Sequence, residues 1–209
     1  INCKAIINCE YSNIKYILTD SRKLIWPQET IFTAIMTSSG DGHRFISELY
    51  SEGVRNFIVS DKYTIKKEFS EANYIISKDP LRTLQQLAAA HRKQFSVPVI
   101  GITGSNGKTI VKEWLYQLLR NDYYITRSPK SYNSQIGIPL SVWEMDNNTQ
   151  LGIFEAGISK VGEMQYAESI ICPNIGIFTN LGQAHQEGFE SSEQKLKEKL
   201  LLFRNSDTL

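Results

Sequence analysis

The stretch 97–119, VPVIGITGSNGKTIVKEWLYQLL, constrains the fold of this chain more than any other. Its apolar, β-branched start at 97–102 is typical of a buried strand, and a glycine-rich segment follows at 103–107. Beyond Lys108 and Thr109, apolar residues recur at helical spacing: Ile110, Val111, Trp114, Leu115, Leu118 and Leu119. A strand, a glycine-rich turn, Gly-Lys-Thr and a helix in this order form the context of a phosphate-binding loop, or P-loop.

The chemistry of such a loop suits a nucleoside triphosphate. Glycines let successive N–H groups point at phosphate oxygens, and the new helix adds the positive end of its dipole. We expect Lys108 to reach the terminal phosphates and the Thr109 hydroxyl to ligate Mg²⁺. The strict motif has its first glycine where this chain has Ile102, but Gly-Lys-Thr and both flanking elements favour nucleotide binding over a generic glycine-rich turn. The predicted ATP-binding residues are Gly104, Ser105, Asn106, Gly107, Lys108 and Thr109.

The composition excludes several classes of protein. The chain has 209 residues, of which 41% are hydrophobic. This composition is typical neither of a disordered protein nor of a membrane protein. It carries 23 basic and 22 acidic residues, which argues against binding to nucleic acid or to an anionic membrane. No apolar run is long enough for a transmembrane helix, so we expect no membrane insertion. Cys3, Cys9 and Cys172 show no CxxC spacing; we expect small buried thiols in a reducing, cytoplasmic location.

Strand and helix patterns alternate along the whole chain, which predicts an α/β fold. We divide it into a small α/β unit at 1–96 and a second unit at 97–209, the first part of a P-loop ATPase domain with a parallel sheet. Ser191 and Gln194 resemble a capping box and predict a last helix, and another is expected at 161–167. Strands are expected at 16–18, 31–35, 57–59, 74–76, 97–102, 124–126, 151–154 and 175–179.

Polar side chains follow the strands of the second unit at the point where ligands collect in a parallel sheet. Glu155 closes the strand at 151–154, and a carboxylate beside a P-loop is typical of a Mg²⁺ ligand rather than a surface charge. His185 lies in the loop after the strand at 175–179, although Mg²⁺ prefers oxygen ligands. Composition alone predicts a solvated helix face for three later lysines, Lys195, Lys197 and Lys199.

Together these motifs resemble the Mur ligase family, the ATP-dependent enzymes that build the peptidoglycan stem peptide. The resemblance covers nearly the whole chain. The segments at 132–139, 155–158, 162–163 and 184–189 are most similar to the family members that join D-alanyl-D-alanine to UDP-N-acetylmuramoyl-tripeptide. The motifs that carry it are GITGSNGKT at 101–109, TDSR at 19–22, DGH at 41–43, YNSQIGIP at 132–139, EAGI at 155–158, GE at 162–163 and AHQEGF at 184–189.

The resemblance implies a role for each candidate site residue. Ser21 and Arg22 would contact uridine diphosphate in an amino-terminal substrate-binding domain, and Asn133 would lie near the muramyl-peptide. Lys199 stands where several family members carry a carbamylated lysine, and its carbamylation is left open. The implied catalytic residues are Lys108, Glu155, His185 and Lys199, and the implied metal ligands are Thr109, Glu155 and His185. The implied substrate-binding residues are Ser21, Arg22, Asp41, His43, Asn133 and Ser134.

The implied reaction forms an amide bond. ATP phosphorylates the carboxylate of UDP-N-acetylmuramoyl-tripeptide, and the amine of D-alanyl-D-alanine attacks the acyl phosphate. Another Mur-type or folylpolyglutamate-type ligase is an alternative within the same chemistry. A P-loop kinase or regulatory NTPase, and a non-catalytic uridine-nucleotide-binding module, are alternatives from other classes.

Both ends of the sequence, Ile1 and Leu209, suggest a fragment. We therefore expect the adenine and amine-substrate contacts beyond Leu209, and no turnover by residues 1–209 alone. Some bacteria fuse this kind of ligase to an alanine racemase, so such a domain is compatible with this ending. Ile110 stands where the family usually has Thr or Ser, and we expect it to pack beneath its helix.

Overall fold

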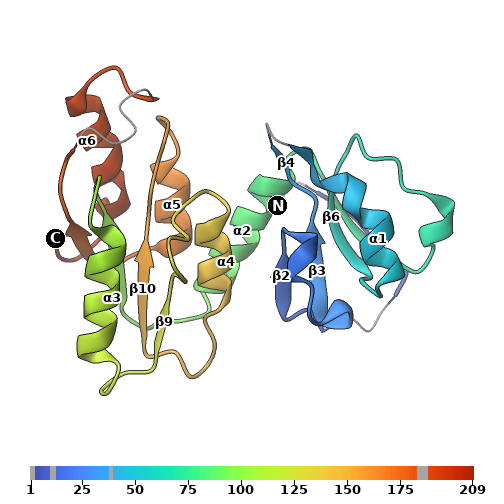
Figure 1. Ribbon diagram of the computed structural model, residues 1–209, viewed down its shortest axis with the longest axis horizontal. Coiled ribbons are helices and arrows are strands. Elements are labelled where there is room, and N and C mark those ends of the chain that lie inside the picture. Colours follow the sequence, from blue (N-terminus) through green and yellow to red (C-terminus); the bar gives the residue numbers. More distant parts are fainter. Residues whose placement is uncertain (1–2, 10–12, 38–39, 183–187) are drawn as a thin grey trace. The chain divides into compact units, whose positions relative to one another are not determined.

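The computed structural model describes residues 3–9, 13–37, 40–182 and 188–209. The chain forms two compact units, Ile1–Leu84 and Gln85–Leu209 (Figure 1). The division lies inside helix α2 (Pro80–Arg92), earlier than the division after residue 96 that the sequence predicted. The reason is that the second half of α2 packs with the second unit, where Ala88 belongs to the hydrophobic core. The assignment of the units to a uridine-nucleotide substrate and to ATP stays a prediction.

The first unit contains a five-stranded sheet in the order β1-β7-β6-β3-β2, in which only β1 is antiparallel to its neighbour. Alternate side chains of these strands, including Phe32, Phe57 and Tyr74, form a core with Ile46 and Leu49 of the short helix α1. The strands are β1 (Lys4–Ile6), β2 (Tyr16–Leu18), β3 (Thr30–Thr33), β6 (Asn56–Ser60) and β7 (Asn73–Ser77), and the helix is α1 (Ile46–Ser51).

Short elements complete the first unit. A two-stranded ribbon joins β4 (Met36–Thr37) to β5 (Gly40–Asp41). The 3₁₀ turns are η1 (Ser21–Lys23), η2 (Pro27–Glu29), η3 (Gly42–Phe45) and η4 (Lys67–Phe69). Among the described parts of both units, no helix has the length and apolar character needed to cross a bilayer.

The second unit is built on a fully parallel sheet in the order β11-β8-β10-β9. One face of this sheet packs against α3, through the side chains of β8 and β10 that point toward this helix. The elements are β8 (Val99–Thr103), α3 (Lys108–Leu119), β9 (Ile125–Arg127), α4 (Gly137–Trp143), β10 (Leu151–Glu155), α5 (Met164–Ile171), β11 (Ile175–Phe178), α6 (Ser192–Leu200) and η6 (Leu201–Phe203).

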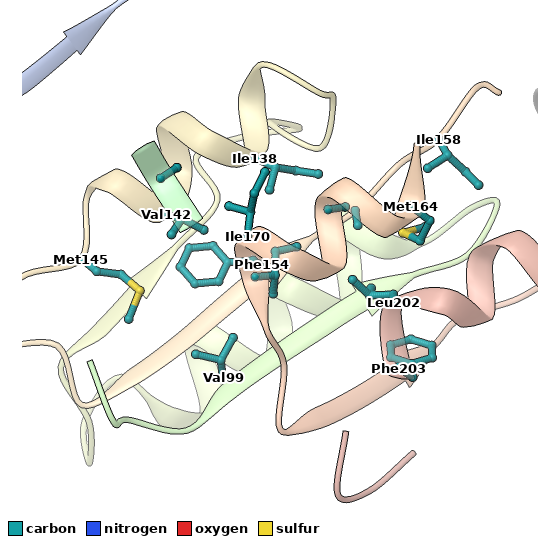
Figure 2. Close-up of a cluster of buried hydrophobic side chains, with 14 of the residues drawn as sticks. Val99, Ile138, Val142, Met145, Phe154, Ile158, Met164, Ile170, Leu202 and Phe203 are labelled. Atoms are coloured by element: carbon teal, nitrogen blue, oxygen red, sulfur yellow. The ribbon is translucent and has the colours of Figure 1, made fainter. Parts of the chain in front are cut away.

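The larger core of this unit lies on the opposite face of the sheet (Figure 2). Val99 and Phe154 point to this face, whereas their neighbours Ile100 and Ile153 point toward α3, as the two-residue period of a strand requires. The elements that cover this face are α4, α5, η6 and the second half of α2. Helices on both faces and parallel strands confirm the predicted α/β class.

The apolar residues of α3 form two stripes with different environments. Val111, Leu115 and Leu119 pack on the sheet. Ile110, Trp114 and Leu118 are 57%, 64% and 73% exposed. The expectation that Ile110 packs beneath the helix is therefore wrong, because the i, i+4, i+8 spacing places these three residues beside the buried stripe rather than within it.

The predicted strands are all present, with ends within two residues of their expected positions. The last helix begins as expected, with the Ser191 hydroxyl accepting from the Gln194 amide at 3.1 Å. The helix expected at 161–167 begins later, as α5, because the Glu163 carboxylate holds a turn before it by accepting from the Ser159 and Lys160 amides.

The three cysteines differ from the prediction in their burial. All three are free thiols, as expected, but Cys3 and Cys172 are exposed and Cys9 is half-buried. Cys172 ends α5 in the left-handed region, with φ of 46°, and Cys3 precedes the edge strand β1. Burial of these two thiols was therefore a wrong expectation.

We predict that replacing Arg92 destabilises the second unit. This buried guanidinium donates to the carbonyl oxygens of Ile171 at 3.0 Å, Phe95 at 2.6 Å and Cys172 at 3.3 Å. Arg92→Met leaves these acceptors without their donor, which should lower the free energy of unfolding by about 2–4 kcal/mol. Urea unfolding measures the loss, and Lys93→Met, at the exposed neighbouring position, is the matched control. Equal midpoints for the two variants would contradict the prediction.

Candidate functional site

The glycine-rich loop connects β8 to α3 as the sequence predicted. Gly104 and Gly107 have φ angles of 139° and 82°, which side-chain-bearing residues rarely adopt. A Cβ at Gly104 would also lie 2.0 Å from the hydroxyl oxygen of Thr179. Glycine is therefore required at position 104 both by the backbone conformation and by the close approach of the segment after β11.

That segment holds the loop through Asn180. The Ser105 amide donates to the Asn180 carbonyl at 2.8 Å, and the Asn106 amide donates to the Asn180 side-chain oxygen at 3.2 Å. The Thr179 hydroxyl donates to the Asn106 carbonyl at 2.6 Å. Two amides of the predicted phosphate cradle are thus bonded within the chain, while the first N–H groups of α3 have no partner inside their own helix. The start of α3 is consequently the part of the loop best placed to meet an anion.

Two lysine side chains contact this loop, and a third contacts the segment that holds it. The half-buried Lys108 ammonium donates to the carbonyls of Gly104 at 2.9 Å and Ser105 at 3.2 Å. Lys199 reaches the same Gly104 oxygen at 3.0 Å, and Lys195 donates to the Gly182 carbonyl at 2.6 Å. These contacts gather positive charge beside Gly104.

The environment of these lysines corrects the expectation of a solvated helix face. Lys195 and Lys199 are buried, because their i, i+4 spacing puts both on the side of α6 that faces the loop. Lys197 alone points to solvent, where it pairs with Glu193. Burial lowers the pKa of Lys199 to about 8, and repulsion from Lys108 and Lys195 adds to the effect. Burial also lowers the pKa of Lys108, with attraction to Glu155 opposing it.

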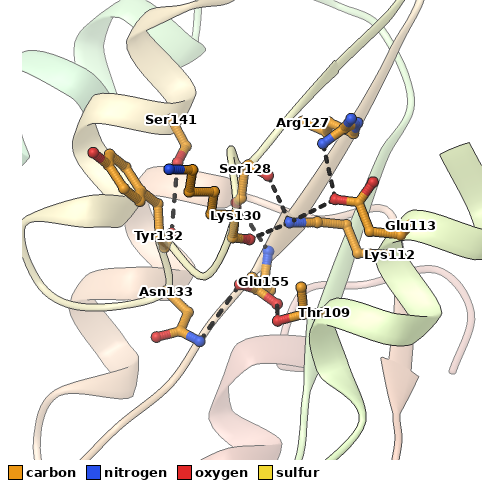
Figure 3. A network of polar contacts seen from close by, with 10 residues as sticks. All are labelled: Thr109, Lys112, Glu113, Arg127, Ser128, Lys130, Tyr132, Asn133, Ser141 and Glu155. Atoms are coloured by element: carbon orange, nitrogen blue, oxygen red, sulfur yellow. Dashed lines mark hydrogen bonds and ion pairs between the residues drawn. The ribbon is translucent and has the colours of Figure 1, made fainter.

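Glu155 lies at the carboxyl end of β10, fully buried, and meets two other predicted site residues (Figure 3). The Thr109 hydroxyl donates to one carboxylate oxygen at 2.9 Å, and the Asn133 side-chain amide approaches the other at 3.5 Å. Burial raises the pKa of Glu155, while the hydrogen bond from Thr109 and the charge of Lys112 oppose that rise. The two predicted Mg²⁺ ligands from different elements, Thr109 and Glu155, are therefore in contact.

The donor set at this point suits Mg²⁺. A hydroxyl and a carboxylate are the hard oxygen ligands that Mg²⁺ prefers, and this ion usually keeps several waters and takes the rest of its ligands from phosphates. Within the described ranges, no group of three or more His, Cys, Asp or Glu side chains is arranged to hold a metal. Two protein oxygens beside a phosphate-binding loop therefore match a nucleotide-bound Mg²⁺ better than a metal enclosed by protein ligands alone. His185, the third predicted ligand, lies outside the described residues.

Asn133 and Ser134 belong to the segment between β9 and α4. The Asn133 carbonyl accepts from the Gly157 amide at 2.8 Å, which joins this segment to the one after β10. The exposed Ser134 contributes its hydroxyl to the start of α4, where it accepts from the Gly137 amide at 3.1 Å. The structure brings Asn133, but not the Ser134 hydroxyl, to Glu155.

The candidate residues of the first unit shape their own loops. The exposed Arg22 guanidinium pairs with Asp20 at 2.8 Å, and that pairing lowers the pKa of Asp20. Ser21 begins the η1 turn that the Asp20 side chain caps.

Asp41 and His43 form a second local pair. Asp41 caps η3 and contacts His43 Nδ1 at 2.5 Å. The other ring nitrogen of His43 accepts from the Ser60 amide at 2.9 Å, so the proton lies on Nδ1. Both nitrogens of this imidazole are thus committed within the fold.

Sequence reasoning missed Lys112, whose ammonium is fully buried beside Glu155 and donates to the Ser128 carbonyl at 2.7 Å and to the Lys130 carbonyl (Figure 3). One signal could have found it: Lys112 shares the inward face of α3 with Leu115 and Leu119, where a lysine interrupts the apolar pattern. Asn180 was also missed, and its position after β11 carries no such signal.

Comparison with curated proteins finds similar sequences named UDP-N-acetylmuramoyl-tripeptide–D-alanyl-D-alanine ligase. The relative from Bacillus subtilis is 32% identical over 191 residues, covering 91% of this chain and 41% of its own length. The relative from Treponema pallidum is 34% identical over 186 residues, covering 86% of this chain and 40% of its own. The chain therefore spans about two fifths of the length of these relatives.

Solved structures show the same similarity. MurF from Acinetobacter baumannii superposes with a TM-score of 0.83 at 28% identity, covering 92% of this chain and 41% of its own. MurF ligase from Thermotoga maritima, solved in complex with ADP, gives a TM-score of 0.81 at 26% identity, covering 96% of this chain and 47% of its own.

The sequence profile of the Mur ligase middle domain matches residues 102–208, which are 107 of the 209 residues. The match contains the loop, the carboxylate at the end of β10 and the lysines of α6. Because this profile matches more than half of the chain, and relatives more than 30% identical match most of it, the chain belongs to the Mur ligase family.

Proposed function

We propose that the protein containing this chain is an ATP-dependent ligase that joins D-alanyl-D-alanine to UDP-N-acetylmuramoyl-tripeptide. The names of the curated relatives support the two substrates. The observation that carries the proposal is the Thr109–Glu155 contact beside a loop whose carbonyls hold the Lys108 ammonium. That arrangement combines a cationic phosphate site with oxygen ligands for Mg²⁺, as ATP-dependent phosphoryl transfer requires.

The residues of the loop would act by binding and by neutralising charge. Lys108 and the first amides of α3 would bind the ATP phosphates, and the Lys108 ammonium would exchange its loop carbonyls for phosphate oxygens. Charge develops on the transferred phosphoryl group as the tripeptide carboxylate attacks it, and fixed cations in a partly buried site stabilise that charge. The acyl phosphate formed in this way then reacts with the amine of D-alanyl-D-alanine, forming the amide and releasing phosphate.

Thr109 and Glu155 would supply protein ligands for Mg²⁺. The ion, when bound, neutralises the phosphate charge and lowers the barrier to phosphoryl transfer. Glu155 is suited to this role because its carboxylate is buried and held in place by hydrogen bonds, and Asn133 orients its second oxygen. His185 remains in the proposal as a further ligand.

The first unit would bind the uridine diphosphate part of the substrate. The 86% exposed Arg22 and the neighbouring Ser21 lie on a turn that the Asp20 carboxylate rigidifies, and a guanidinium is well suited to a diphosphate. Asp41 and His43 would support the substrate surface by fixing the η3 loop, since their polar atoms already bond within the chain.

The proposal predicts acceptor-dependent ADP release. The full-length protein should release ADP in a coupled assay only when both UDP-N-acetylmuramoyl-tripeptide and D-alanyl-D-alanine are present. Lys108→Met should weaken binding of a non-hydrolysable ATP analogue by about 10- to 100-fold, because a charge-assisted contact is lost. Lys160→Met, at an exposed position, is the control. ADP release without any amine acceptor would instead favour a kinase or NTPase.

We predict that Glu155→Gln weakens the response to Mg²⁺. The amide keeps the shape of the side chain but removes its charge, so half-saturation by Mg²⁺ in analogue binding should require at least about tenfold more ion. Calorimetric titrations at several Mg²⁺ concentrations measure this shift. Glu193→Gln, at an exposed surface pair, should leave the Mg²⁺ dependence unchanged. An unaltered dependence in Glu155→Gln would exclude this carboxylate as a ligand.

We further predict that Lys199 takes up carbon dioxide as a carbamate. Its pKa of about 8 leaves much of the amine neutral at mildly alkaline pH, and a carbamate would place a negative charge between Lys108 and Lys195. Labelled bicarbonate should give a carbamate carbon signal by NMR at about pH 8 that declines toward about pH 6, where the amine is protonated. Lys199→Met should remove the signal, and Lys197→Met, on the exposed side of the same helix, should retain it. A signal that survives Lys199→Met would disprove the assignment.

A further inference from the structure

Lys112 is a buried cation that the proposed reaction does not use. Its ammonium donates to the Ser128 carbonyl at 2.7 Å and to the Lys130 carbonyl, and it forms an ion pair with the Glu113 carboxylate at 3.2 Å (Figure 3). A fully buried ammonium is tolerated only when it is hydrogen-bonded and paired with an opposite charge. The two carbonyls come from one segment, so the side chain joins α3 to that segment.

The segment joined by Lys112 carries part of the candidate metal site. It runs from the end of β9 to Asn133, and Lys130 adopts a left-handed conformation with φ of 49°. At its start, the Ser128 hydroxyl accepts from the Glu155 amide at 3.3 Å. At its end, Asn133 approaches the Glu155 carboxylate. The segment therefore contacts both the backbone amide and the side-chain carboxylate of Glu155.

The Glu113 carboxylate that pairs with Lys112 has a second basic partner. Glu113 accepts from Arg127 at 2.9 Å, and the Arg127 guanidinium lies 4.0 Å from the centre of the Tyr116 ring. The Glu113 carboxylate is consequently held on the α3 side of the segment.

We infer that Lys112 is a positioning residue that holds segment 128–133 against α3, so that Asn133 and Glu155 keep their positions relative to Thr109. The inference rests on the proposed function, because these relative positions matter for binding Mg²⁺ with ATP. Lys112 lies one helical turn after Thr109, and its acceptors lie on the segment that supports Glu155. Loss of the ammonium would therefore loosen the Asn133 side of the site before it disturbs the sheet.

The experiment compares three variants of the full-length protein with a matched control. Lys112→Met removes the charge and all donors, Lys112→Gln keeps an amide donor without charge, and Lys112→Arg keeps the charge. Arg120→Met removes an exposed cation from the end of the same helix and serves as the control. Hydrogen exchange without nucleotide reports on segment 128–133, and calorimetry with an ATP analogue reports on the Mg²⁺ dependence.

We expect amides of segment 128–133 to exchange about tenfold faster in Lys112→Met, while those of β8 and β10 keep their rates. Half-saturation by Mg²⁺ should rise about tenfold, with analogue binding in the absence of metal unchanged. Lys112→Arg should recover most of both effects, because guanidinium can donate to both carbonyls. If Lys112→Met does not fold, the same two shifts are expected in Lys112→Gln.

Wild-type exchange and Mg²⁺ dependence in both uncharged variants would overturn the inference. Faster exchange spread equally over the whole second unit would also overturn it, since Lys112 would then stabilise the fold without positioning the segment. Failure of the proposed function is distinguishable from both outcomes. If the unaltered protein binds no ATP analogue, the proposed function fails, while the exchange comparison without nucleotide still decides whether Lys112 holds the segment.

Discussion

The parallel register of β10 and β11 with β8 is the constraint on which the candidate site depends. Glu155 lies opposite Ile102, and Phe178 lies opposite Thr103, so all three strands end at the same edge of the sheet. The glycine loop, the buried carboxylate and the segment that starts at Thr179 meet at that edge because parallel strands share one carboxyl end. A slip of one residue in either pairing would turn Glu155 or the loop anchor to the other face.

Buried charge is the second feature of the site, and main-chain carbonyls compensate much of it. Lys108 and Lys199 share the Gly104 oxygen, and Lys112 is held by two carbonyls of segment 128–133. Carbonyl dipoles satisfy an ammonium group without cancelling its charge. The loop therefore keeps a positive field in a partly desolvated place, which suits a polyphosphate.

The first unit handles its charged residues differently. Asp20 and Asp41 each cap a 3₁₀ turn and pair with the basic residue two positions later, Arg22 or His43. In both places the motif stabilises its own turn through contacts within the chain. Arg22 is largely exposed, whereas the His43 ring is enclosed and bonded to Asp41 and to the Ser60 amide.

The sequence by itself determined the local parts of this protein: the strands, the glycine turn, and the helix that begins with Lys108. These follow from periodicity and from the need for glycine at positive φ, both of which act over a few residues. Only the tertiary structure decided which lysines are buried, which stripe of α3 faces the sheet, and that Lys112 joins α3 to the segment beside Glu155. The physical reason is distance along the chain: Lys199 meets an oxygen 95 residues away and Thr109 meets a carboxylate 46 residues away, and no local pattern encodes such pairings.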